Sequence, residues 1–284
     1  MPPRRLRLDA ELVRRGLARS RDHAATLVAD GRVKVSGAVA TKPATGVTTD
    51  VALLVVEDDD RPDYASRGGH KLAGALGAFE PHGLLVAGRR VLDAGASTGG
   101  FTDVLLRHQA SQVCAVDVGY GQLVWRLQQD ERVLVLDRTN IRDLTPQVLG
   151  GPVDLVVGDL AFISLRLVLP ALVGVSRPDA DLLLMVKPQF EVGKDRVGKG
   201  GVVRSPVLRA EAVQGVADTA AGLGWGLRGV APSVLPGPSG NVEFFVWLRQ
   251  GPVAVAPHQV VAAVTAQDVQ VGPAASAPGE RLEP

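Results

Sequence analysis

Cysteine is almost absent from this 284-residue sequence, which contains a single one, Cys114. An intramolecular disulfide and a cysteine-based zinc site are therefore excluded, and the apolar residues around Cys114 predict a buried structural thiol. No uninterrupted apolar stretch reaches the roughly 18 residues of a membrane span. The N-terminus, MPPRRLRLD, lacks the apolar region of a secretory signal. We therefore expect a cytoplasmic chain that holds no metal and does not cross a membrane.

A large net charge is also missing, since the formal value is +1 at pH 7. The charge is unevenly distributed, because residues 1–42 contain ten lysines and arginines against four acids and carry a local charge of +6. Such segregation favours a polyanion as partner, although a solvated helix surface explains it equally well. Aromatic residues make up only 4% of the chain, so recognition of RNA by shape and phosphate contact is expected rather than extensive base stacking.

The segment 4–62 predicts a small α+β unit with a linker. Leu8 and Leu12 share one face of a first helix that Gly16 can close, and Ser20 is a good N-cap for a second helix. Valines that alternate around a Ser-Gly pair then predict a hairpin. The acidic, proline-containing stretch at about 57–64 is the predicted linker.

Residues 63–250 alternate between apolar strands and helices. The predicted strands are RRVLDAG, QVCAVDV, RVLVLD, VDLVVGDL, DLLLMVKP and NVEFFVWL. The first five imply parallel pairing in a doubly wound, Rossmann-like α/β sheet, and the sixth follows turn-rich sequence as the last strand of a hairpin would. Residues 251–284, rich in Ala, Val, Pro and Gly, are expected to form a poorly ordered tail.

A glycine-rich turn follows the first of these strands, in VLDAGASTGGFTDVLL. Serine replaces the middle glycine of the dehydrogenase fingerprint, and Asp93 brings negative charge to the place where a pyrophosphate would bind. Asp93 instead suits a zwitterionic ligand such as the methionine moiety of S-adenosylmethionine. Asp117, at the end of the next strand, can accept the ribose hydroxyls of an adenosyl group. The alternative is an α/β turn that binds no ligand.

Methyl transfer from a sulfonium requires a positioned and deprotonated acceptor. Methylation of a cytosine carbon usually needs a cysteine, which is missing at any exposed predicted position, and the Asp159-Leu160-Ala161-Phe162 turn lacks the prolines typical of exocyclic-nitrogen methylation. Lys187 and Asp159 end neighbouring predicted strands, and such a pair can stabilise an alkoxide at a ribose 2′-hydroxyl. The alternative is a structural salt bridge at the edge of the sheet.

The whole segment from residue 4 to residue 249 resembles the TlyA family of bacterial ribosomal RNA 2′-O-methyltransferases. Residues 7–43 resemble an S4 RNA-binding domain, although Ser36 stands where such domains often carry asparagine. The remainder is similar to the FtsJ-type ribose methyltransferase fold, through the motifs SRGGHKL, LDAGASTGGFTD, GDLAFISL, VKPQFEVGKDRVGKGGVVR and GPSGNVEFF. The resemblance implies S-adenosylmethionine as cofactor, ribosomal RNA or a ribosomal subunit as partner, and a catalytic tetrad of Lys71, Asp159, Lys187 and Glu243.

Two larger sets of site residues follow from the motifs, the charge and the resemblance together. The expected cofactor-binding residues are Asp93, Gly95, Ser97, Thr98, Gly99, Gly100, Phe101, Asp117, Asn140 and Asp159. The expected RNA-binding residues are Arg4, Arg7, Arg14, Arg19, Arg21, Arg32, Lys34, Lys42, Arg67, Lys194, Arg196, Lys199 and Arg204. A flexible, solubilising loop is the alternative for the last four.

Three other classes of function remain open. A module that only binds RNA would not need Asp93, Asp117 and Lys187 in register, and a membrane-lytic protein would need an amphipathic or spanning segment, which is not visible. S4 domains also precede pseudouridine synthases, but no GRLD-type catalytic aspartate follows the S4-like segment. A monomeric rRNA methyltransferase acting on the small subunit, the large subunit or both is the preferred interpretation.

Overall fold

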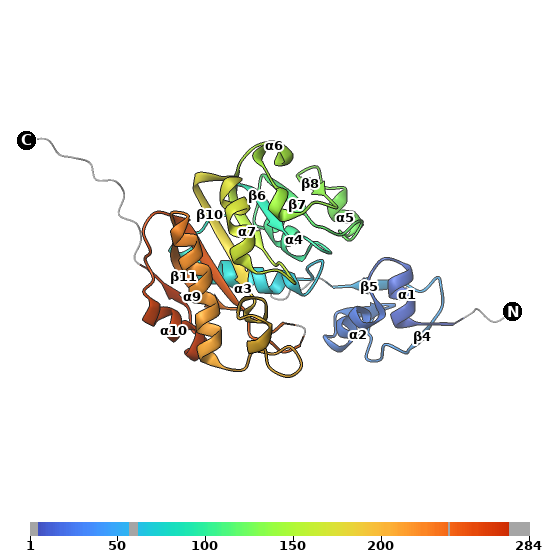
Figure 1. Ribbon diagram of the computed structural model, residues 1–284. Helices are drawn as coiled ribbons and strands as arrows, with labels where there is room; N and C mark the ends of the chain where they lie inside the picture. Colours follow the sequence, from blue (N-terminus) through green and yellow to red (C-terminus); the bar gives the residue numbers. More distant parts are fainter. Residues whose placement is uncertain (1–4, 57–61, 238, 273–284) are drawn as a thin grey trace, which may run out of the picture. The chain divides into compact units, whose positions relative to one another are not determined.

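A computed structural model describes residues 5–56, 62–237 and 239–272, and the chain divides into two compact units, 1–63 and 64–284 (Figure 1). Most of the predicted linker falls outside the described residues. Each unit has its own hydrophobic core.

The first unit consists of two helices and short strands. Its elements are β1 (Leu6–Arg7), α1 (Leu8–Arg14), α2 (Arg21–Ala29), β2 (Val33–Val35), β3 (Ala38–Val39), β4 (Gly46–Val47) and β5 (Leu53–Val55). The Ser20 hydroxyl accepts a hydrogen bond from the backbone amide of His23 at 3.1 Å, so it caps α2 as predicted. Ser36 and Gly37 have φ values of 48° and 86°, as a two-residue type I′ hairpin turn requires.

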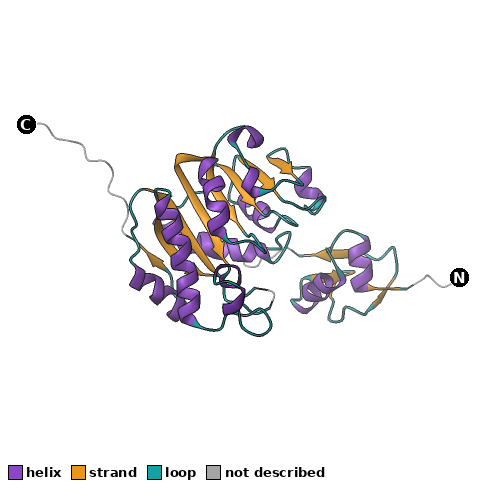
Figure 2. Ribbon diagram, in the orientation of Figure 1, coloured by secondary structure: helices purple, strands orange, loops and turns teal. Residues whose placement is uncertain are grey.

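The second unit is built on an eight-stranded sheet with the order β13-β11-β12-β10-β9-β6-β7-β8 (Figure 2). The strands are β6 (Arg90–Ala94), β7 (Gln112–Val116), β8 (Val133–Leu136), β9 (Val153–Gly158), β10 (Ser176–Val186), β11 (Trp225–Pro232), β12 (Phe244–Gln250) and β13 (Gln270–Val271). Five neighbouring strands, in the order β10-β9-β6-β7-β8, pair in parallel. This confirms the predicted doubly wound arrangement.

Helices cover both faces of this sheet and bury two apolar layers. Side chains alternate between the layers because successive residues of a strand point to opposite faces, as Val156 and Val157 do. The helices are α3 (Gly68–Phe79), α4 (Gly100–Arg107), α5 (Trp125–Gln128), α6 (Pro146–Leu149), α7 (Leu165–Gly174), α8 (Pro188–Glu191), α9 (Pro206–Gly222) and α10 (Pro257–Ala266), with 3-10 turns η1 (Glu80–His82), η2 (Ile141–Asp143) and η3 (Lys194–Arg196).

The expectation of a poorly ordered tail was wrong for residues 251–272. Pro257 begins α10, and Val260, Ala263 and Val264 are buried at helical spacing in the same core as α9. The strand β13 then pairs with β11 at the edge of the sheet. The high content of Ala, Pro and Gly in this segment hides a three-residue apolar stripe, and the remainder of the predicted tail, 273–284, lies outside the described residues.

The strand β12 and the short edge strand β13 run against the other six strands of the sheet. The strand β12 lies antiparallel between β10 and β11, so its first residues come to the edge where the parallel strands end. Glu243, which directly precedes β12, therefore meets Lys187, which directly follows β10, at the same edge. The strand β12 was predicted from the sequence. Its neighbour β11 was not, because glycines interrupt the apolar pattern of β11.

Candidate active site

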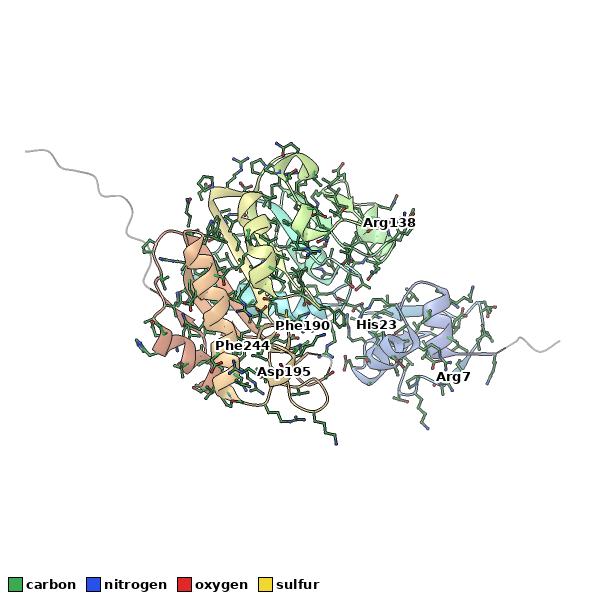
Figure 3. The ribbon with its side chains drawn as sticks, in the orientation of Figure 1. Arg7, His23, Arg138, Phe190, Asp195 and Phe244 are labelled. Carbon is green, nitrogen blue, oxygen red and sulfur yellow. The ribbon has the colours of Figure 1, made fainter. Side chains whose placement is uncertain are left out.

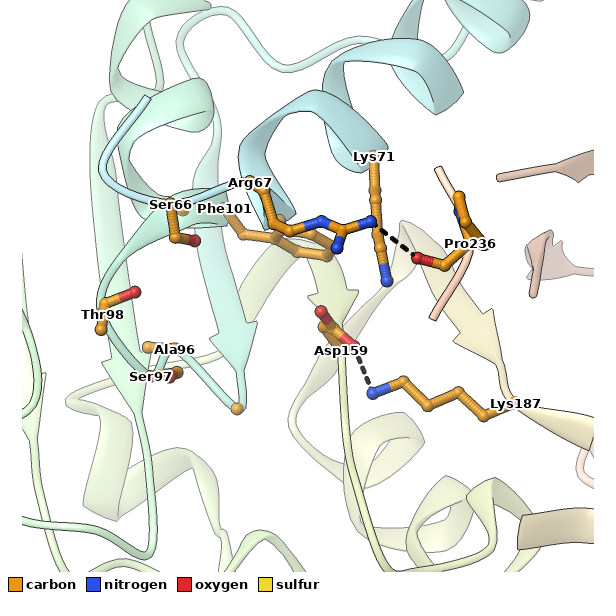
Figure 4. Close-up of a pocket in the computed structure, with 13 residues that line it drawn as sticks. Ser66, Arg67, Lys71, Ala96, Ser97, Thr98, Phe101, Asp159, Lys187 and Pro236 are labelled. Atoms are coloured by element: carbon orange, nitrogen blue, oxygen red, sulfur yellow. Dashed lines mark hydrogen bonds and ion pairs between the residues drawn. The ribbon is translucent and has the colours of Figure 1, made fainter. Parts of the chain in front are cut away.

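A cavity of about 260 Å³ opens at the carboxyl edge of the parallel strands (Figure 4). Polar residues from four motifs line it: SRGGHKL, the glycine-rich turn, GDLAFISL and VKPQF. Pro236 completes the wall. Its lining residues are Ser66, Arg67, Gly68, Lys71, Gly95, Ala96, Ser97, Thr98, Gly100, Phe101, Asp159, Lys187 and Pro236. The sheet thus brings together six predicted cofactor residues, two predicted catalytic lysines and one predicted RNA contact. Open α/β sheets bind their ligands at this edge.

The glycine-rich turn between β6 and α4 approaches its neighbours too closely for side chains. The amides of Gly95 and Ala96 both donate to the carbonyl of Val116, and Gly95 has a φ of 87°. A Cβ at Gly95 would lie 3.0 Å from the carbonyl oxygen of Asp159. A Cβ at Gly100 would overlap the hydroxyl of Ser66. Glycine is therefore required here for both conformation and space.

Asp93 lies below this turn and is completely buried. The hydroxyl of Thr102 donates to one carboxyl oxygen at 2.7 Å, whereas the other oxygen has no hydrogen-bond partner among the described residues. Burial, helped by the nearby charges of Asp159 and Asp117, raises the pKa of Asp93 to about 7 in spite of the hydrogen bond from Thr102. An unpartnered buried carboxyl oxygen next to a ligand-sized cavity can accept a cationic group.

Asp117 follows β7 and organises the adjacent turns. Its two carboxyl oxygens accept the backbone amides of Ser97 at 2.8 Å and Gly119 at 2.7 Å. Each oxygen retains a lone pair for a further donor. Asn140 starts η2 after the next strand, where its side chain accepts from the amide of Arg142 at 3.1 Å. Both residues lie outside the lining of the cavity, at the ends of the strands beyond the glycine-rich turn.

Lys187 and Asp159 form the first of two ion pairs at the site, with 2.6 Å between Nζ and Oδ1 (Figure 4). This Oδ1 has no well-oriented hydrogen-bond donor among the described residues, so the contact is mainly electrostatic. Both side chains are largely but not completely buried and line the cavity. The ammonium group therefore remains accessible to a substrate from the cavity side.

Lys71 and Glu243 form the second ion pair, with 2.5 Å between Nζ and Oε2. The side chains are 7% and 0% exposed, and the second oxygen of Glu243 has no partner among the described residues. Met185 brings its sulfur to 3.9 Å from the same ammonium group. Two cations thus face the site, each neutralised by one acid, as a reaction that develops negative charge would require.

Three of the predicted RNA-binding arginines of the first unit lie in two clusters, each around a shared acid. Arg7 and Arg21 both pair with Asp9, and Arg14 pairs with Glu11. Hydrogen bonds from the arginines lower the pKa of each acid to about 2. Arg15 also pairs with Glu11, so each buried acid serves two arginines and each cluster keeps a net positive charge. Arg7, Arg14 and Arg21 remain about half exposed and can contact a phosphate.

The other predicted contacts of this unit differ in their surroundings. Arg19 pairs with Asp63 at 2.5 Å, and Arg32 is largely buried with its guanidinium donating to the carbonyl of Val56 at 3.0 Å. Lys42 is exposed and Lys34 is partly exposed on β2. Arg4 lies outside the described residues. Arg32 therefore joins the strands of its own domain, whereas Lys42 is open to a ligand.

The basic loop 193–204 links α8 to α9, and Asp195 marks its position in Figure 3. Lys194, Lys199 and Arg204 are exposed, while the guanidinium of Arg196 pairs with Glu211 at 2.5 Å. Arg67, on the other side of the cavity, is exposed and donates to the carbonyl of Pro236 at 3.0 Å.

Exposed aromatic side chains on segments that follow the strand ends were missed in the sequence. Phe162 is 91% exposed with a left-handed φ of 64°, and its ring centre lies 5.5 Å from that of Phe190. Trp125, at the start of α5, is 71% exposed, whereas the other two tryptophans of the chain are buried. Phe101, a predicted cofactor residue, is mostly buried and stacks on Phe245. The sequence pattern does not indicate which of these aromatic side chains face solvent.

The observed sheet order, with an antiparallel strand inserted beside the fifth parallel strand, defines a Rossmann-like methyltransferase fold. Comparison with known families agrees, since residues 64–250 match the FtsJ-like methyltransferases and residues 6–51 match the S4 domain. The chain belongs to the TlyA family, in which these two domains are combined.

Relatives of this family support the assignment over most of the chain. A Mycobacterium tuberculosis protein named 16S/23S rRNA (cytidine-2′-O)-methyltransferase TlyA is 62% identical over 246 residues, which is 87% of this chain and 90% of the relative. Hemolysin A of Brachyspira hyodysenteriae is 32% identical over 84% of this chain and 98% of its own. A solved structure named as a hemolysin of Streptococcus thermophilus aligns with a TM-score of 0.69 and 34% identity, covering 93% of this chain and 96% of the other.

Proposed function

We propose that this protein transfers a methyl group from S-adenosylmethionine to a ribose 2′-hydroxyl of ribosomal RNA. The observation that carries the proposal is the Lys187–Asp159 ion pair in the wall of the cavity beside the glycine-rich turn. A ribose hydroxyl is a poor nucleophile at neutral pH, and a fixed cation next to it stabilises the developing alkoxide. The name of the Mycobacterium tuberculosis relative points to the same acceptor.

The residues around the glycine-rich turn fit the cofactor. The unpartnered oxygen of Asp93 suits the ammonium group of the methionine moiety, and the carboxylate of Asp117 suits the ribose hydroxyls. Gly95 and Gly100 line the cavity and pack too closely against Asp159 and Ser66 to carry side chains, which keeps the backbone of the turn at the surface of the cavity. S-adenosylmethionine supplies an activated methyl group. The chain's own contribution is to bind and orient both substrates and to stabilise negative charge at the acceptor oxygen.

The two ion pairs have different proposed tasks. Lys187 faces the cavity and lowers the pKa of the acceptor hydroxyl, while Asp159 fixes its position and balances its charge. Lys71 and Glu243, which are more deeply buried, add a second neutralised cation behind the first. Together they form the proposed Lys-Asp-Lys-Glu tetrad. A proton leaving the ribose would pass to solvent through the open side of the cavity.

The product of the reaction distinguishes this function from base methylation. The protein is incubated with labelled S-adenosylmethionine and three separate substrates: small subunits, large subunits and protein-free ribosomal RNA. We expect label at a nucleotide that resists alkaline cleavage, because a 2′-O-methyl group removes the internal nucleophile. Label on a base at an alkali-labile nucleotide would overturn the proposal, and comparison of the three substrates identifies the target particle.

Membrane lysis is the second candidate, because one relative is named Hemolysin A. Across the described ranges, none of the helices is long and apolar enough to cross a bilayer. The purified protein is added to dye-filled liposomes with and without S-adenosylmethionine. Leakage at low protein concentration, independent of the cofactor and of Lys187, would favour the membrane-active function.

Replacement of Asp117 by alanine should weaken cofactor binding. The variant loses one to two charge-assisted hydrogen bonds, each worth about 1.5–3 kcal/mol, and it also frees the amides of Ser97 and Gly119 that shape the turn. Isothermal calorimetry with S-adenosylmethionine measures the effect, with Asp137→Ala on the next strand as a matched control. Unchanged affinity in Asp117→Ala would contradict the proposed position of the adenosyl group.

Cofactor affinity should rise with pH through about 7, the value to which burial raises the pKa of Asp93. Below this pH the carboxyl is protonated and attracts an ammonium group only weakly. In the folded protein the pKa lies above its ordinary value of 3.8, so the native state binds the extra proton between these values and stability should fall as the pH rises across them. Asp93→Asn should bind weakly at every pH and lose both dependences. Calorimetry at pH 6 to 8, about one unit either side of that pKa, tests the affinity, and thermal melts from about pH 4 to pH 8 test the stability.

RNA binding should depend on the first unit and on salt. A shortened chain that begins at Tyr64 is expected to retain cofactor affinity and lose most RNA affinity, because the half-exposed arginines around Asp9 and Glu11 are then missing. For the full chain, a few phosphate contacts imply about a tenfold loss of affinity between 50 and 200 mM salt. Filter binding measures both effects. Methylation at full rate by the shortened chain would contradict this assignment.

A further inference from the structure

The buried amide of Asn241 connects two parts of the molecule that are far apart in sequence. Asn241 is almost completely buried and lies two residues before Glu243. Its side-chain oxygen accepts the backbone amide of Val203 at 3.0 Å, and its side-chain nitrogen donates to the carbonyl of Gly201 at 2.8 Å. Both partners belong to the basic loop 193–204. The side chain thus pairs with two backbone groups of the loop, as a neighbouring strand does in a sheet.

The base of this loop is fixed from several sides. Val203 is buried, its amide is bound by Asn241 and its carbonyl accepts from the guanidinium of Arg209 at 2.9 Å. An isolated antiparallel bridge joins Gly198 to Val202. Within these contacts, Gly201 has a left-handed φ of 76°, so the backbone turns sharply there. A loop with four glycines, two of them adjacent, would otherwise sample many conformations.

The basic side chains project from this fixed base. Lys199 is exposed next to the turn, and Arg204 is exposed directly after Val203, with its guanidinium donating to the carbonyl of Lys199 at 3.3 Å. One end of the loop follows α8, which begins directly after Lys187. The other side is held by Asn241, beside Glu243. The loop is therefore attached to the segments of both lysine–acid pairs.

We propose that Asn241 is a positioning residue that holds the loop 193–204 in the conformation that presents Lys199 and Arg204 to RNA. It contacts neither cofactor nor reacting atoms, so it sets the affinity for RNA and not the chemical step. This inference rests on the proposed function, because it requires that the loop binds the RNA substrate. The two exposed cations contact phosphates, and the amide of Asn241 lowers the entropy lost when the loop is ordered on the RNA.

Two variants of Asn241 separate its two hydrogen bonds. Asn241→Leu keeps the approximate volume and removes both bonds, whereas Asn241→Asp keeps the acceptor for the amide of Val203 but cannot donate to Gly201. We expect the KM for RNA to rise about tenfold in Asn241→Leu, as the loss of about 1.4 kcal/mol implies, with kcat within about twofold of the parent. Asn241→Asp should be intermediate. Cofactor affinity should be unchanged in both.

A double-mutant cycle tests whether Asn241 acts through the loop. In a parent that carries Lys199→Ala and Arg204→Ala, the further change Asn241→Leu should not weaken RNA binding, because the contacts that it positions are already missing. In a parent that carries Arg14→Ala in the first unit, Asn241→Leu should keep its full effect. Additive effects with the loop variants would overturn the proposal.

Other outcomes separate the role of Asn241 from a general structural one. A fall in kcat with unchanged KM for RNA would show that Asn241 acts through Glu243 and would overturn the inference. If Asn241→Leu does not fold, Asn241→Asp must still show a raised KM with unchanged cofactor affinity, or the inference fails. Absence of any RNA methylation by the unmodified protein would instead contradict the proposed function.

Discussion

Replacement of Lys187 by alanine should reduce turnover by roughly 10²-fold or more, the usual loss for one preorganised electrostatic group. Lys187 lines the cavity next to Asp159, and its ammonium group is accessible from the cavity. Cofactor affinity and thermal stability should change little, because the glycine-rich turn and Asp93 are untouched. Single-turnover methylation of ribosomal RNA at saturating cofactor measures the chemical step directly.

Lys187→Arg is the matched variant for this experiment. It keeps the positive charge, but a planar guanidinium cannot replace a compact ammonium group 2.6 Å from Asp159 without displacing the carboxylate. We expect poor rescue of the rate. A rate within a few-fold of the parent in Lys187→Ala would remove Lys187 from the chemistry and with it the reason to propose a ribose acceptor.

Glu243→Gln should destabilise the protein as well as inactivate it. The side chain of Glu243 is fully buried against Lys71, so its neutral replacement leaves an unpaired buried ammonium group. Breaking a buried pair by removing one partner typically costs about 3–5 kcal/mol. Chemical denaturation measures the free energy of unfolding, and a loss below about 1 kcal/mol would show that Lys71 readily finds water or another partner.

The double variant Lys71→Met with Glu243→Leu separates stability from catalysis. Apolar side chains of similar volume often replace a buried ion pair at no cost in stability. This variant should therefore recover the free energy of unfolding lost in Glu243→Gln and remain inactive. Recovery of both stability and turnover would mean that the pair serves only the fold, and the proposed tetrad would then reduce to Lys187 and Asp159.

Much of the fold could be predicted because the parallel strands are short apolar runs that end in polar residues. Asp93, Asp117, Asp159 and Lys187 are recognisable for this reason, since Asp93 lies in the last residues of a strand, the other three directly follow strands of the same sheet, and such ends meet at one edge. Glu243 reaches that edge from the start of an antiparallel strand, which no local pattern indicates. Its assignment therefore depended on the resemblance to a known family.

Other features could not be predicted because they depend on contacts between distant segments. The sequence gives no sign that Asp9 and Glu11 are buried and shared among arginines, or that Arg32 turns inward to Val56. The helix α10 was missed because an apolar stripe of three small residues is weak until α9 supplies a surface for it. Local propensity cannot show burial that only tertiary packing creates.

The unequal exposure of the tryptophans has a spectroscopic consequence. Trp125 is 71% exposed, while Trp225 and Trp247 are 3% and 2% exposed in the core of the sheet. A soluble quencher such as iodide should therefore reach one indole and leave the other two emitting at shorter wavelength. Because Trp125 follows the segment that carries Asp117, the quenched fraction of the emission can report, without any added label, whether the proposed adenosyl side of the site is open or covered.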